Sequence, residues 1–62
     1  MKVSDFKVGD KFYMNGYTLI EGKKIKILCQ LISYEGNNQY MVATKWRWEI
    51  VNGKDKVFKI KN

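Results

Sequence analysis

The chain has 62 residues, 12 of them Lys or Arg and 6 of them Asp or Glu, so its formal net charge is +6. A domain of about 60 residues buries only about 60% of the surface of its unfolded chain, which leaves too small a core to enclose a cofactor. Histidine is absent and Cys29 is the single cysteine, which excludes an internal disulfide, a zinc cluster and a Cys–His pair. We therefore expect one domain over residues 1–62 that has no metal, no other cofactor and no enzymatic activity.

The N-terminal residues Met1 to Phe6 contain no apolar stretch as long as a signal peptide or a membrane helix requires. A lone cysteine without a disulfide framework is typical of a reducing compartment. These features predict a cytoplasmic protein without membrane contact. The abundance of Lys, Asn and Ile is typical of AT-rich bacterial or phage genomes.

In chain order, the first expected element is a helical turn at Ser4 to Phe6, with Ser4 as its cap and Gly9 ending it. Four turns follow, each marked by Gly or Asn, residues that tolerate the positive φ of tight hairpins. These turns are Asn15-Gly16, Glu21-Gly22, Glu35-Gly36-Asn37-Asn38 and Asn52-Gly53. Four turns predict five strands: Lys11 to Met14, Tyr17 to Ile20, Lys24 to Tyr34, Gln39 to Val51 and Asp55 to Lys61.

Apolar residues recur at every second position in the two longest of these segments, which is the period of a strand with one buried face. The first series is Ile25, Ile27, Cys29 and Leu31, and the second is Tyr40, Val42, Thr44, Trp46, Trp48 and Ile50. Because a slip of one residue moves a whole set of side chains to the other face, this pattern also restricts the pairing register.

A four-residue loop at positions 35–38 pairs Leu31 with Val42 and Ile27 with Trp46. A two-residue turn at Asn15-Gly16 pairs Phe12 with Leu19, and a three-residue loop at positions 52–54 pairs Trp48 with Phe58. The predicted inner face is Phe12, Met14, Leu19, Ile25, Ile27, Cys29, Leu31, Val42, Trp46, Trp48, Phe58 and Ile60.

A single flat sheet would leave that inner face in water. Folding the five antiparallel strands into a small barrel buries it and removes most free edges. We therefore expect an all-β domain, a five-stranded antiparallel meander closed into an SH3-like or OB-like barrel.

The same register aligns cations across three strands of the outer face. Lys26 lies opposite Arg47, which lies opposite Lys59, and like charges placed directly opposite each other are destabilising by up to about 1 kcal/mol. An anion would relieve this repulsion. The predicted cationic surface is Lys26, Lys45, Arg47, Lys59 and Lys61.

Three interpretations of this surface remain open. It can hold the phosphates of DNA or RNA, with Tyr34, and Tyr13 near it, stacking on bases. It can bind an acidic protein. It can also serve only to keep a small domain soluble and to protect strand edges.

Trp46 and Trp48 share one face and also have two interpretations. Opposite Ile25, Ile27, Phe58 and Ile60 they are core residues, since a small core gains much from two indoles. If that face is open, they form a stacking platform and the functional surface lies there. Cys29 is on the inner face, and we expect a buried, inert thiol.

A second outward cluster is apolar, with Ile32 opposite Met41 and Leu28 nearby. It is either buried at a barrel corner, where a strand bends, or exposed as a contact for a partner or for a second copy. The protein is accordingly expected to be a monomer or a homodimer.

Two functional hypotheses follow. The first is a basic nucleic-acid-binding barrel of low sequence specificity, with phosphates on the five cations and a base on Tyr34. The alternative is a protein-interaction module, a small phage or mobile-element factor that docks on a larger acidic host protein through Leu28, Ile32 and Met41.

Overall fold

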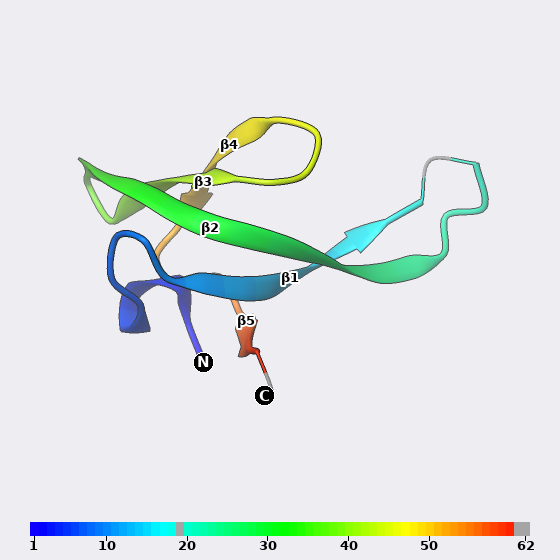
Figure 1. Ribbon diagram of the computed structural model, residues 1–62, viewed down its shortest axis with the longest axis horizontal. Helices are drawn as coiled ribbons and strands as arrows, with labels where there is room; N and C mark the ends of the chain where they lie inside the picture. The colour runs from blue at the N-terminus through cyan, green and yellow to red at the C-terminus, as the bar shows by residue number, and fades with distance from the viewer. Residues whose placement is uncertain (19, 61–62) are drawn as a thin grey trace.

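The computed structural model describes residues 1–18 and 20–60. Five strands form one antiparallel sheet in the order β4-β3-β2-β1-β5, and the described helical structure is a single short 3-10 helix (Figure 1). The all-β class with five antiparallel strands is thus confirmed. The elements are η1 (Val3–Asp5), β1 (Lys11–Tyr17), β2 (Lys24–Gly36), β3 (Gln39–Ala43), β4 (Trp48–Asn52) and β5 (Val57–Lys59).

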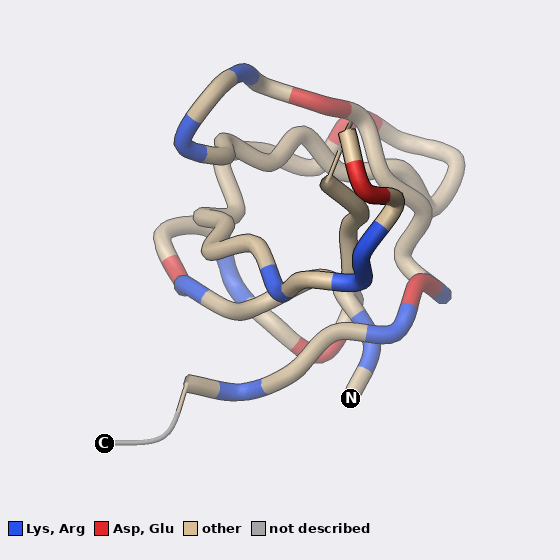
Figure 2. Tube along the Cα trace, turned by 90° about the vertical axis from the view of Figure 1, so that its right-hand side faces the viewer, with Lys and Arg blue, Asp and Glu red and all other residues tan. Residues whose placement is uncertain are grey.

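The sheet is not closed into a barrel, because the described strands pair only in that linear order and β4 and β5 form its two edges. The closed barrel expected from the sequence is therefore not confirmed. The sheet is nevertheless strongly curled, since residues 53–56 alone join its two edge strands and span at most about 18 Å. Figure 2 shows the chain wrapping around a common interior.

The hairpin between β2 and β3 turns at Asn37 and Asn38, whose φ angles of 52° and 60° fit a tight turn. The loop is therefore shorter than the predicted one. Two bulges on β2, between Leu31 and Ser33 and between Tyr34 and Gly36, absorb the difference in length. Leu31 consequently still pairs with Val42, as the sequence predicts.

The predicted long strand from Gln39 to Val51 is wrong, because the chain turns at Thr44 to Arg47. The N–H of Thr44 donates to the carbonyl of Arg47 at 2.8 Å, and the Thr44 hydroxyl accepts from the N–H groups of Trp46 and Arg47 at 3.2 and 3.1 Å. A threonine side chain thus stabilises this turn without glycine or asparagine. The turn also reverses the alternation, so Trp48 pairs with Ala43 on the outer face.

Strand β1 does not end at Asn15-Gly16 but continues to Tyr17 and pairs with β2 over seven residue pairs, among them Phe12 with Cys29. A Cβ at Gly16 would collide with the side chain of Ile27, so this glycine leaves room for Ile27 inside a strand and does not form a turn. The predicted partner of Phe12, Leu19, lies outside the described residues. The predicted turn at Glu21-Gly22 is confirmed, with Gly22 at φ 62°.

Strand β5 pairs with β1, where Met14 lies opposite Val57, and not with β4 as predicted. The predicted pair of Trp48 with Phe58 is therefore wrong. The hydrophobic effect explains the difference: pairing with β1 buries Val57 completely beside Phe12 in the core.

The core lies on the inner side of the curl, and six of the predicted inner residues belong to it or pack against it: Phe12, Met14, Ile27, Cys29, Leu31 and Val42. Trp46 and Trp48 are exposed and do not belong to it. Three further buried residues, Val3, Val51 and Val57, do not belong to the predicted inner face.

The N-terminal segment covers the side where the sheet remains open. The N–H groups of Val3 and Ser4 donate to the carbonyls of Asp55 and Gly53, both at 3.1 Å, and the N–H of Val57 donates to Met1 at 2.8 Å. These bonds fix η1 next to the link between β4 and β5, with Val3 fully buried. The 3-10 helix begins at Val3, one residue before the predicted turn, and Ser4 is not its cap.

Candidate nucleic-acid interface

Two shallow grooves share Tyr13 and Lys26, one along β5 at the edge of the sheet and the other on the outer face of β1 and β2. The register explains the face, since Tyr13 pairs with Leu28 on one side and with Phe58 on the other, while the neighbouring Phe12 points into the core. The β5 groove has a volume of about 810 Å³ and is lined by Met1, Tyr13, Lys26, Val57, Phe58, Lys59 and Ile60. The β2 groove has a volume of about 500 Å³ and is lined by Lys11, Tyr13, Lys26, Ile27, Leu28, Gln30, Ala43, Thr44, Lys45 and Trp46.

Four lysines, Lys11, Lys26, Lys45 and Lys59, line these grooves and are exposed. None of the described residues that line either groove is acidic. The grooves therefore hold a concentrated positive charge next to aromatic rings, an environment that suits an anionic ligand with flat groups.

Lys26 occupies the centre of this arrangement. Its Nζ lies 3.8 Å from the centroid of the Phe58 ring, and the Nζ of Lys56 lies 5.6 Å from the same centroid. Contact with the ring face stabilises the ammonium and restricts the long side chain. The ring thus holds Lys26 where both grooves meet.

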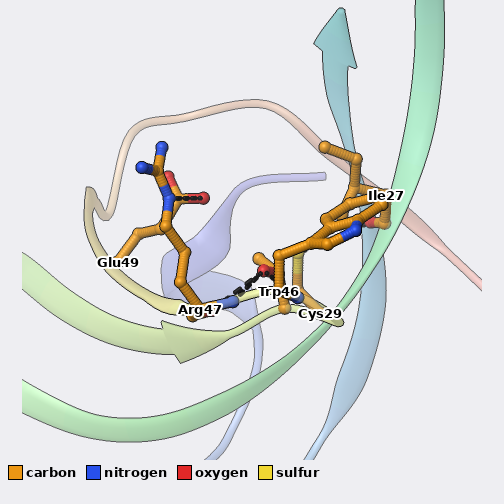
Figure 3. Close-up of polar contacts among 6 residues, drawn as sticks. Ile27, Cys29, Trp46, Arg47 and Glu49 are labelled. Atoms are coloured by element: carbon orange, nitrogen blue, oxygen red, sulfur yellow. Dashed lines mark hydrogen bonds and ion pairs between the residues drawn. The ribbon is translucent and has the colours of Figure 1, made fainter. Parts of the chain in front are cut away.

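The predicted row of Lys26, Arg47 and Lys59 does not form. Lys26 lies opposite Asn15, and Lys59 lies opposite Phe12. Arg47 lies in the turn after β3, where its Nε is 3.5 Å from the carboxylate of Glu49 (Figure 3). The row fails because the turn at Thr44 to Arg47 and the pairing of β5 with β1 change both registers on which it depended.

The structure nevertheless brings three of the six predicted nucleic-acid contacts, Lys26, Lys45 and Lys59, to the two grooves. Tyr34 lies elsewhere, packed against Tyr40 with ring centroids 5.0 Å apart, and its hydroxyl accepts from the Asn38 N–H at 3.3 Å. Arg47 does not line either groove. Lys61 lies outside the described residues.

Both indoles are exposed, Trp46 by 67% and Trp48 by 64%, so the core interpretation of the pair is wrong. Trp46 lines the β2 groove, whereas Trp48 lies on the outer face of β4. The second interpretation required the face shared with Ile25 and Ile27 to be open, whereas that face is the core and the tryptophans have left it. Phe58, which was predicted for the core, lines the β5 groove. Its position follows from its pairing with Tyr13 across β1 and β5, which the sequence pattern does not indicate.

The predicted apolar contact surface is rearranged. Met41 pairs with Ser33 and not with Ile32, because the bulge after Leu31 shifts the register by one residue. Ile32 is half-buried at that bulge. Leu28 is exposed, as are Trp48 and Ile50 on the same outer face, so exposed apolar residues extend over β2 and β4.

Cys29 is buried at 2% exposure, as predicted. Burial raises the pKa of its thiol from 9.0 to about 11, the negative charge of Glu49 also raises it, and a hydrogen bond with the Met14 backbone lowers it. The nucleophilic thiolate form of Cys29 is therefore scarce at neutral pH, so this thiol is unreactive.

This shift predicts a pH-dependent stability. Between pH 9 and 11 the unfolded state loses the thiol proton while the folded state keeps it, so the free energy of unfolding falls as pH rises; below pH 9 the contribution is complete. The loss reaches about 2 to 3 kcal/mol. In urea titrations, the stability advantage of wild type over Cys29→Ala should shrink between pH 8 and pH 10.5. If the stability advantage of wild type stayed constant over this pH range, it would contradict the raised pKa of Cys29, because all other titrating groups are the same in both proteins.

Comparison with known proteins finds no matching family model, curated protein or solved structure. The described residues contain no helix long and apolar enough to span a membrane. They also contain no group of three or more acidic or cysteine side chains arranged to hold a metal ion.

Proposed function

We propose that this protein binds DNA or RNA through the outer face and the β5 edge of its sheet, mainly by phosphate contacts and with low sequence specificity. The supporting observation is that four lysines surround two adjoining grooves with aromatic rings and no described acidic residue. Phosphates bind to such cations with release of counterions, while rings provide stacking surfaces that accept any base.

The proposal revises the predicted contact residues. Lys26, Lys45 and Lys59 stay in it, Lys11 joins them, and Tyr13 replaces Tyr34 as a ring beside the cations. Arg47 leaves it because Glu49 partly neutralises its charge. The proposed place of action is the cytoplasm. For the architecture we propose a partly open SH3-like barrel, because residues 53–56 join the two edges of a curled sheet.

Salt-dependent binding tests this function. Lys26→Gln combined with Lys45→Gln should weaken binding to a labelled single-stranded oligonucleotide and lower the slope of log K against log salt by about 1.4, at about 0.7 for each lost phosphate contact. Fluorescence anisotropy at several salt concentrations measures both quantities.

The matched control is Lys7→Gln combined with Lys54→Gln, which removes the same charge from exposed positions outside both grooves. This variant should keep most of the slope. Equal losses in the two double variants would show a diffuse charge effect and reject the grooves as the site. Absence of wild-type binding to DNA and RNA at low salt would reject the function itself.

A protein-interaction module is the second candidate, favoured by the exposed apolar side chains of Leu28, Trp48 and Ile50 on the outer face. These residues would provide contact area, and the lysines would steer an acidic partner. A folded protein that binds no nucleic acid at low salt would favour this candidate over the first.

A further inference from the structure

One edge of β2 is unpaired over almost half of the strand. Lys24 to Gln30 pair with β1, but the pairing with β3 on the other side begins only at Gln30 and Ala43. Among the described residues, none pairs with the second edge of positions 24–29. In an antiparallel strand alternate residues direct their N–H and C=O groups to each side, so this edge presents free donors and acceptors.

The turn at Thr44 to Arg47 places an indole and an ammonium beside this free edge. Trp46 and Lys45 line the β2 groove together with Lys26 and Ile27 of β2, and Figure 3 shows Trp46 in the same turn as Arg47. Since the N–H of Trp46 donates to the Thr44 hydroxyl at 3.2 Å, the turn holds the backbone of this residue. The backbone that carries the exposed indole is therefore fixed before any ligand arrives.

We infer that the ligand of the β2 groove is single-stranded DNA or RNA, with a base stacked on Trp46 and phosphates on Lys26 and Lys45. Base edges then face the free backbone groups of residues 24–29. This inference rests on the proposed function and specifies the form of nucleic acid that the site takes.

A duplex fits these features poorly. Its base faces are stacked inside the helix, so they offer nothing to the exposed indole. A single strand exposes both base faces and base edges. Stacking of one base on an aromatic ring changes affinity by roughly ten- to a hundredfold, which is enough to separate the two forms.

The two tryptophans provide a matched experiment, because they are almost equally exposed and only Trp46 lines the groove. Trp48→Phe leaves Trp46 as the only indole, and Trp46→Phe leaves Trp48. On titration with oligo-dT, we expect strong fluorescence quenching in the protein that retains Trp46 and little in the one that retains Trp48. Trp46→Ala should weaken binding at least tenfold, whereas Trp48→Ala should change it less than threefold.

The preference for single strands is measured with one sequence, single-stranded and as a duplex of equal length, at the same salt concentration. We expect at least tenfold tighter binding of the single strand. Equal or tighter binding of the duplex, or equal quenching of the two tryptophans, would overturn the inference. So would equal quenching of Trp46 by an acidic peptide, since that indicates a peptide strand added to the β2 edge.

The proposed function and this inference fail in different ways. If Lys26→Gln with Lys45→Gln lowers the salt slope but the tryptophan variants behave alike, phosphate binding stands and the single-strand site is wrong. If neither DNA nor RNA binds at low salt, both are wrong. Circular dichroism tests whether each tryptophan variant is folded. We expect that it is, because the side chains of Trp46 and Trp48 are exposed.

Discussion

Replacing Phe12 by alanine is expected to unfold most of the protein at room temperature. Phe12 is fully buried, and its ring packs against Phe6 with centroids 4.7 Å apart. Removing a buried phenylalanine costs about 3 to 5 kcal/mol. The core of a chain this short supplies a net stability of about the same size. Urea titration followed by far-UV circular dichroism measures the loss; fluorescence reports it poorly, because both tryptophans are already exposed in the folded state.

The neighbouring residue provides the control. Tyr13 is half-buried on the opposite face of β1 and lines both grooves. Tyr13→Ala should therefore keep a cooperative urea transition and lose affinity for nucleic acid, the reverse of the change at position 12. Similar urea midpoints for Phe12→Ala and Tyr13→Ala would contradict the assignment of the two faces.

The strand class and much of the inner face were predictable because they depend on local periodicity. Ile27, Cys29 and Leu31 alternate on β2, and any partner that buries one of them buries all three. The predicted pair of Leu31 with Val42 is correct only because two bulges on β2, which periodicity does not reveal, compensate for the shorter turn.

The register beyond Ala43 was not predictable, because the turn at Thr44 to Arg47 contains no glycine, asparagine or proline. Its stabilising element is the Thr44 hydroxyl, which accepts two backbone hydrogen bonds only once the turn has formed. In the sequence, Thr44 and Trp46 simply continue the alternation of a strand. This single turn moved Trp46 and Trp48 from the predicted core to the surface.

The candidate interface was predictable in its charge but not in its geometry. An excess of six positive charges requires a cationic surface somewhere. Which lysines meet depends on β5 joining β1 across more than forty residues of sequence, which places Phe58 beside Tyr13 and under Lys26. A pairing of that range leaves no periodic signal in either segment.

The second large effect on stability is expected for Val3→Asp, at the open side of the sheet. Val3 is fully buried, and its N–H holds the N-terminal segment to the carbonyl of Asp55. The substitution removes about 1.5 to 3 kcal/mol of apolar burial. It also places an unpaired carboxylate in an apolar environment, which costs more. We expect loss of the cooperative thermal transition at pH 7, measured by circular dichroism.

The same substitution at Val8, which is 64% exposed, should leave the melting temperature nearly unchanged. The effect at position 3 should also depend on pH. Burial raises the pKa of the introduced carboxyl above its unfolded value of about 3.9, so the neutral form fits the core better and the deficit relative to Val8→Asp should shrink near pH 4. Equal melting temperatures of the two variants at pH 7 would mean that the N-terminal segment is not part of the core, and that another element must shield Phe12 and Val57 where β4 and β5 do not pair.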